Sequence, residues 1–151
     1  FGRLLDEYRY NNESLPVERQ NLVNSWRGSD PYFGYNISLT GDRELVHWKH
    51  YFDIAGYEAV GMYEGAYLYY MGAWRPEYIS CMEDNRPYYN APSREAIVRR
   101  IMKASGSTFD FDDFLAKDAR ALSSGAVMAA QAPAVPYDFV PLAPPVLIDN
   151  R

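Results

Sequence analysis

Three observations predict that this chain folds as a compact domain of the α+β class. A chain of 151 residues, of which 48% are hydrophobic, is long enough and apolar enough to bury one core. Residues 57–70 place aromatic and apolar residues on both sides of Glu64-Gly65-Ala66, which predicts two strands around a tight turn. Residues 90–106 carry the start and stop signals of a helix.

The first elements are short. Residues 1–10 are mixed in character and are interpreted as the last turn of a helix whose body lies upstream. Residues 11–14 are polar and predict a loop. After Pro16, residues 17–26 predict a short helix that ends near Gly28.

A second helix is predicted over residues 42–53. Leu45, Trp48 and Phe52 recur at helical spacing, and Gly56 follows as a stop signal. This pattern predicts that the three apolar side chains share one buried face.

Two histidines fall on this predicted helix, three residues apart. His47 and His50 could both face one metal ion at that spacing. Trp48 and Phe52 occupy the buried face, however, and no acidic or Cys partner completes a ligand set. A structural role is therefore the favoured interpretation.

The helix signal at residues 90–106 is the clearest in the chain. Asn90 is a polar cap, Pro92 lies in the first turn and Gly106 closes the pattern. A shorter helix is predicted over residues 112–122. Residues 1–122 are thus expected to form the domain, and residues 123–151, rich in Ala and Pro, an extended linker or tail.

Composition excludes some partners. Twenty acidic residues against 15 basic ones give a net charge of -5, the wrong sign for a protein that neutralises phosphates, so nucleic acid is not expected. No apolar run approaches the roughly 20 residues of a membrane-spanning helix, so no membrane span is expected. Cys81 is the only cysteine, which rules out an internal disulfide.

Four motifs together resemble a known enzyme family. They are Phe1-Gly2-x-Leu4-x-Asp6-Glu7-Tyr8, Gly61-x-Tyr63-Glu64-Gly65-Ala66-Tyr67, Gly72-x-Trp74-Arg75-Pro76, and Met82 in a turn. In this order they are similar to the IgA-peptidase family of zinc metallopeptidases, which are metzincin-like zincins, over about residues 1–103. The resemblance implies the C-terminal part of the catalytic domain, a lower zincin subdomain of helices with a short aromatic β-hairpin and a Met-bearing turn.

In that family a helix carrying H-E-x-x-H ends directly before a segment similar to the start of this chain. Its two histidines hold zinc and its Glu serves as general base, so all three are expected upstream of residue 1. The resemblance then implies Asp6 as the third zinc ligand, with Glu7 as the alternative. Metzincins place that ligand three residues after the glycine, whereas Asp6 is four after Gly2. Asp6 could instead cap the loop or pair with Arg9.

The resemblance also implies other site residues. Met82 is expected to pack beneath the metal without binding it. Tyr88 is a candidate hydrogen-bond donor to the tetrahedral intermediate. The residues expected to contact substrate are Tyr63, Glu64, Tyr67 and Arg75.

The function implied is zinc-dependent hydrolysis of peptide bonds in a protein or peptide substrate, by a secreted or cell-surface bacterial enzyme. The chain as given is expected to be inactive, because the zinc helix is missing from it. The alternative is a non-catalytic carbohydrate- or protein-binding module, in which exposed aromatic rings stack on sugars. The rings proposed for that role are Tyr67, Tyr69, Tyr70 and Trp74.

Overall fold

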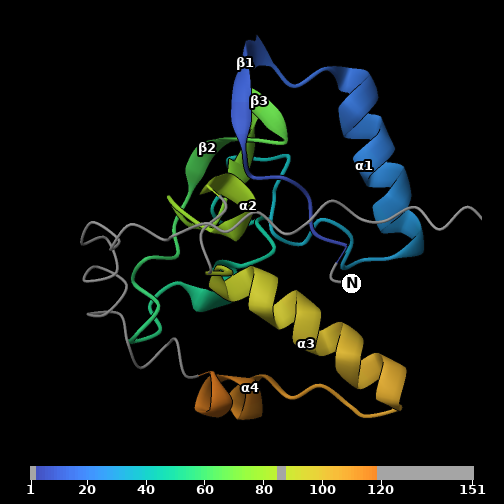
Figure 1. The fold of residues 1–151 in the computed structure, drawn as a ribbon, viewed down its shortest axis with the longest axis vertical. Coiled ribbons are helices and arrows are strands. Elements are labelled where there is room, and N and C mark those ends of the chain that lie inside the picture. The colour runs from blue at the N-terminus through green and yellow to red at the C-terminus, as the bar shows by residue number, and fades with distance from the viewer. Residues whose placement is uncertain (1–2, 85–87, 119–151) are drawn as a thin grey trace, which may run out of the picture.

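A computed structural model describes residues 3–84 and 88–118 of the chain. Within these residues it contains four α-helices, one short 3₁₀ helix and a three-stranded sheet, so the predicted α+β class is confirmed. Figure 1 shows helix α1 standing beside the sheet, and helices α3 and α4 lying together at the other end of the molecule.

Helix α1 spans Val17–Ser29 and confirms the helix predicted after Pro16. Glu18 lies in its first turn and Arg27 in its last, where each charge complements the helix dipole. Its Val23 is fully buried against the sheet side of the core. The Arg27 guanidinium donates to the backbone oxygens of Phe33, Gly34 and Ile37, and so ties the helix to the following loop.

The sheet has the strand order β1-β3-β2. Strands β2 (Tyr63–Ala66) and β3 (Leu68–Arg75) are antiparallel and form the predicted hairpin. The turn lies later than predicted, because Tyr67 and Leu68 carry the positive φ angles of 53° and 75°. Positive φ at two successive residues gives the backbone twist that suits a tight hairpin.

Strand β1 (Arg9–Ser14) pairs in parallel with β3, so the prediction of a loop at residues 11–14 was wrong. The helical turn expected within residues 1–10 is also absent from residues 3–8, where the chain has no regular structure. Most β1 side chains are exposed, which is why the strand looks like a polar loop in the sequence. Pairing with β3 decides its conformation.

The prediction of an α-helix over residues 42–53 was also wrong. This segment consists of turns and the 3₁₀ helix η1 (Lys49–Tyr51). The buried side chains are those of Val46, Trp48 and Tyr51, whereas Leu45 is 67% exposed. Their spacing does not follow one face of an α-helix, and their burial by distant residues overrides the local pattern.

Helix α3 spans Ala91–Ser105 and confirms the clearest prediction. The Asn90 side chain accepts a hydrogen bond from the Ser93 amide, and Gly106 closes the helix in the left-handed conformation. Helix α4 (Phe111–Lys117) begins one residue earlier than predicted, and Asp118 follows it as the C-cap. Residues 119–122 and the tail at 123–151 lie outside the described residues.

Two hydrophobic clusters form the core. The first packs the segment around Trp48, Tyr51 and Tyr57 against α3 and α4, where Phe114 joins it. The second packs the sheet against α1 through Leu15, Val23, Ile37, Ala66, Tyr67 and Ala73.

The two histidines have separate structural partners. The His47 ring stacks on Tyr35 with a centroid distance of 5.5 Å. His50 Nε2 lies 2.8 Å from Glu95 Oε2 on α3. The structural interpretation of this pair therefore agrees with their contacts.

His47 makes stability depend on pH. Burial lowers the pKa of its imidazole from 6.5 to about 4. Between these values the unfolded chain binds a proton that the folded chain does not, so stability falls as pH drops from about 6.5 to about 4. We expect the free energy of unfolding to fall by about 1–3 kcal/mol over this range. The lower end of the range allows for solvent screening, because the ring is only partly buried.

Urea unfolding at pH 7 and pH 4.5 would measure this loss. The control is His47→Phe, which keeps a ring for stacking on Tyr35 but cannot take a proton. The drop in stability with acid should be smaller in the variant. An equal drop in both proteins would show that His47 does not contribute.

Candidate functional site

Residues 3–8 run between the hairpin turn and the Met-bearing turn. The amides of Glu7 and Tyr8 donate to the Met82 carbonyl at 2.9 and 3.1 Å. The Tyr67 amide donates to the Asp6 carbonyl at 2.8 Å. Three regions singled out in the sequence, the first residues, the hairpin and the Met-bearing turn, therefore meet in the fold.

Asp6 presents its side chain to solvent. Its backbone is held by Tyr67, but within residues 3–84 and 88–118 its carboxylate has no hydrogen bond or ion pair. It neither caps the loop nor pairs with Arg9, whose guanidinium donates to the Glu64 carbonyl instead. Asp6 is thus an exposed carboxylate on a backbone held in place.

Glu7 has the opposite environment. Its side chain is fully buried, and both carboxylate oxygens have partners. Oε1 accepts from the Asn36 and Asn90 amides at 2.8 and 2.6 Å, and Oε2 accepts from the Ser80 hydroxyl. We call Glu7, Asn36, Ser80 and Asn90 the Glu7 network. Burial raises the pKa of Glu7 to about 7, against the opposing effect of these hydrogen bonds.

Met82 lies in α2 (Cys81–Asp84), a single helical turn. The turn is held by Ser80, whose Oγ accepts from the Met82 amide at 3.2 Å. Ser80 also binds Glu7, so one hydroxyl connects the Met-bearing turn to the segment that carries Asp6.

The sequence placed Glu64 in the turn of the hairpin, but the structure does not. Glu64 lies within β2 opposite Trp74, and its exposed carboxylate accepts from the Gly72 amide at 3.1 Å. Arg75 is fully buried, and its guanidinium donates to the backbone oxygens of Glu64, Gly65 and Tyr78. Arg75 therefore holds the hairpin backbone together, and direct contact with a substrate is not compatible with its burial.

The two predicted tyrosines of the hairpin differ. Tyr63 is partly exposed, and its ring packs edge-on against Tyr78 at a centroid distance of 5.9 Å. Tyr67 is buried, and the Arg19 guanidinium lies 5.8 Å from its ring centroid. Only Tyr63 thus offers ring surface beside Glu64; Tyr67 contributes its backbone amide to Asp6.

Tyr88 is held by a buried carboxylate. Its hydroxyl donates to Glu77 Oε2 at 2.6 Å, and Glu77 Oε1 accepts from the Ala91 amide at the start of α3. Burial and the nearby Glu77 raise the pKa of the Tyr88 phenol, so it stays protonated at neutral pH. It can act as a donor, but toward a substrate only if it leaves Glu77.

The rings proposed for sugar stacking do not form an exposed platform. Tyr67 is buried, Tyr69 and Trp74 are partly buried, and Tyr70 alone of the four is 43% exposed. The Trp74 ring also covers Gly41, where an added Cβ would lie 2.8 Å from Trp74 Cζ2. This arrangement does not favour the binding-module interpretation.

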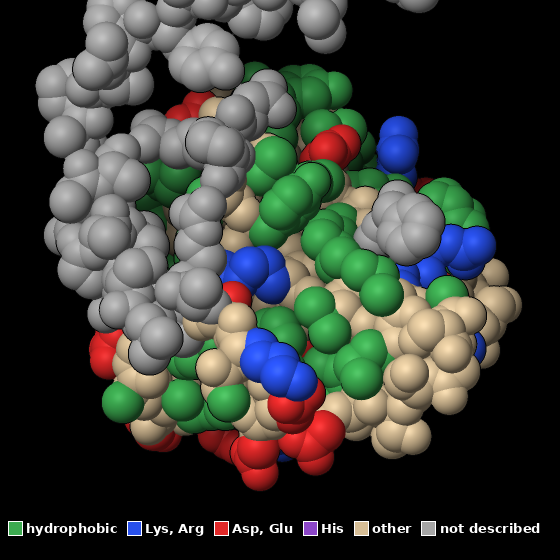
Figure 2. Space-filling view, turned by 60° about the horizontal axis from the view of Figure 1, so that its bottom comes forward, with side chains coloured by type: hydrophobic (Ala, Val, Ile, Leu, Met, Phe, Trp, Pro, Cys, Tyr) green, Lys and Arg blue, Asp and Glu red, His purple; other side chains and the backbone are tan. Residues whose placement is uncertain are grey.

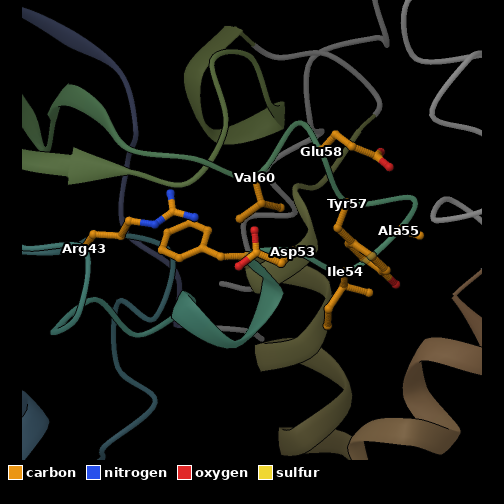
Figure 3. A pocket seen from close by; sticks show the side chains of 8 residues that line it. Arg43, Asp53, Ile54, Ala55, Tyr57, Glu58 and Val60 are labelled. Carbon is orange, nitrogen blue, oxygen red and sulfur yellow. The ribbon is translucent and has the colours of Figure 1, made fainter.

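Two hollows are lined by none of these residues. The first, of about 390 Å³, is formed by the loop that contains Arg43, Asp53 and Glu58. Figure 3 shows Arg43 and Glu58 at opposite sides of it, and the Arg43 guanidinium lies 3.6 Å from the Phe52 ring centroid. Stacking on Phe52 accounts for Arg43 without a ligand.

The second hollow, of about 450 Å³, is an apolar groove between α3 and α4 that includes Ile97, Met102 and Phe114. Figure 2 views the molecule from this end and shows hydrophobic side chains beside a group of acidic ones. None of the predicted site residues lines either hollow.

Within the described part of the chain, no three His, Cys, Asp or Glu side chains are grouped so as to hold a metal ion. The helices described there are also too short or too polar to cross a bilayer. Comparisons with family models, curated proteins and solved structures found no match. The family resemblance therefore stays a prediction.

Sequence reasoning missed the Glu7 network. Asn90 was predicted only as a helix cap, and Asn36 and Ser80 carried no signal. Their partners lie 29 to 83 residues away in the sequence, at distances that no local pattern reports. The buried Glu77 was missed for the same reason.

Proposed function

We propose that this chain is the C-terminal part of the catalytic domain of a zinc-dependent metalloendopeptidase, with a lower zincin subdomain fold. The observation that carries the proposal is the pair of hydrogen bonds from Glu7 and Tyr8 to the Met82 carbonyl. These bonds join residues 3–8, which resemble the segment that follows the zinc-binding helix in that family, to the turn that carries Met82. That turn resembles the one that packs beneath the metal. The resemblance adds that the enzyme is bacterial and secreted or attached to the cell surface.

Asp6 suits a zinc ligand better than Glu7 does. Zinc binds carboxylate oxygen readily, and the Asp6 carboxylate is exposed. The Glu7 oxygens are buried and already accept three hydrogen bonds. Of the two candidates, only Asp6 can reach a metal without dismantling the core.

The remaining candidate residues would bind the substrate or shape the surface that binds it. Zinc, when bound, polarises a carbonyl and lowers the pKa of water. Glu64 is exposed and would accept hydrogen bonds from a peptide, and the partly exposed Tyr63 ring would offer a peptide an apolar surface. Arg75 shapes this surface from inside the protein, and Tyr88 is a neutral phenol that could donate to developing negative charge.

We expect the 151-residue chain to hydrolyse no peptide, because it lacks two zinc ligands and the general base. A longer protein that includes the region before Phe1 should digest casein. A metal chelator should stop this digestion, and added zinc should restore it. Zinc-dependent digestion by the pure 151-residue chain would contradict the proposal.

A single inexpensive observation would test the family directly. The codons before Phe1 should encode H-E-x-x-H on a predicted helix. Their absence would leave an inactive relative or a binding module, and the peptidase proposal would fail.

A further inference from the structure

Residues 3–5 lie against the loop at residues 34–36. The Gly34 amide donates to the Arg3 carbonyl at 2.9 Å. The Asn36 side chain binds Leu5 twice: Oδ1 accepts from the Leu5 amide at 3.0 Å and Nδ2 donates to the Leu5 carbonyl at 2.7 Å. The Asn36 side chain therefore pairs with both backbone hydrogen-bonding groups of Leu5, as a neighbouring β-strand would.

Gly34 allows this close approach. A Cβ at Gly34 would lie 2.6 Å from Leu5 Cδ1, closer than nonbonded carbon atoms tolerate. The residue also has φ of 56°, a conformation that costs other residues energy. The contact between the loop and Leu5 thus depends on glycine.

Asn36 also reaches the far side of Asp6. Its Nδ2 donates to Glu7 Oε1 at 2.8 Å, so one amide contacts the residues before and after Asp6. Leu5 packs against the core and Glu7 is buried, whereas Asp6 between them is exposed. This alternation is that of an extended chain, in which neighbouring side chains point in opposite directions.

We propose that Asn36 and Glu7 are positioning residues that direct the Asp6 carboxylate outward toward a metal ion. The inference rests on the proposed function, in which Asp6 is a zinc ligand. Asn36 holds the backbone on both sides of Asp6, and Glu7 anchors the chain to Ser80 and Asn90. Tyr67 fixes the Asp6 carbonyl from the hairpin.

The physical reason is preorganisation. A ligand on a free terminal segment must lose backbone entropy when it binds a metal. A segment already held in place has lost that entropy during folding. Partners that orient a ligand typically change metal affinity by about 10- to 100-fold.

The first test uses the 151-residue chain, without metal. Asn36→Ala, Glu7→Ala and Gly34→Ala should speed hydrogen exchange at the amides of Leu5 and Tyr67 by about tenfold or more, relative to α3 amides. Gly34→Ala acts by displacing Leu5 and removes no polar group, so it remains informative if another variant does not fold.

The matched control is Phe114→Ala. Phe114 belongs to the other core cluster, so this change lowers overall stability without touching residues 3–8. Glu7→Gln is the conservative variant, because its side-chain oxygen can still accept from Asn36 and Asn90, and it should restore most of the protection. Equal relative exchange in Asn36→Ala and Phe114→Ala would overturn the proposal.

The second test uses the longer catalytic domain and zinc alone. Chelator competition should give a zinc Kd about 10- to 100-fold higher in Asn36→Ala, and little changed in Phe114→Ala. An unchanged Kd in Asn36→Ala would overturn the positioning role. An unchanged Kd in Asp6→Asn would instead overturn the ligand assignment of the proposed function, whatever the exchange data show.

Discussion

Asp6→Asn should lose zinc and peptidase activity together in the longer protein that the proposed function requires, with a zinc helix before Phe1. The change keeps the shape of the side chain but removes the negative charge with which a carboxylate binds zinc. Zinc affinity should fall by about 100-fold or more, since losing a ligand costs more than losing a residue that orients one. Elemental analysis of the dialysed protein and a casein assay would measure both losses.

The control for this experiment is Glu7→Gln. If Asp6 is the ligand, Glu7→Gln should keep most of its zinc, because the amide oxygen can still accept from Asn36 and Asn90. Stability of the metal-free 151-residue chain should change by no more than about 0.5 kcal/mol in Asp6→Asn, because the side chain is exposed. Full zinc in Asp6→Asn with depleted zinc in Glu7→Gln would transfer the ligand role to Glu7.

The largest effect on folding is expected for Trp48→Ala. Trp48 is fully buried in the first core cluster, and its indole N–H donates to the Gly61 carbonyl at 2.9 Å. Truncation leaves a large cavity and an unpaired carbonyl, so stability should fall by about 3–5 kcal/mol. Urea unfolding of the 151-residue chain would measure this loss.

Leu45→Ala is the matched comparison. A helix over residues 42–53 would bury Leu45 together with Trp48, and truncating either would then be costly. In the structure Leu45 is 67% exposed, so Leu45→Ala should change stability by less than about 0.5 kcal/mol. A loss above about 2 kcal/mol in Leu45→Ala would favour the helix over the observed turns.

The elements that the sequence predicted well are those whose signals are local. Asn90 and Gly106 mark the two ends of α3 by hydrogen bonds and backbone conformations that involve only neighbouring residues. The aromatic runs around residue 65 predicted the hairpin for the same reason. Its turn was misplaced by about two residues because Tyr67 and Leu68, unlike Gly, give no sign of positive φ.

The candidate site was predicted in its parts but not in its arrangement. The resemblance favoured Asp6 over Glu7 as the ligand, but only the fold shows that Glu7 is buried and Asp6 is exposed. The resemblance implied that Arg75 contacts substrate, yet its side chain is fully buried and donates to three backbone oxygens. Burial of this kind depends on residues far along the chain.

The sequence by itself determined that this protein is a compact α+β domain with α1, the β2–β3 hairpin, α3 and α4 in that order, because short-range hydrogen bonds and side-chain periodicity encode those elements. Only the tertiary structure decided that residues 9–14 form a strand, since β1 exists through its pairing with β3. It alone decided which carboxylate is exposed, because the Glu7 network joins Asn36, Ser80 and Asn90 across the whole domain. A buried charge must find its partners wherever the chain brings them, and sequence spacing does not record those meetings.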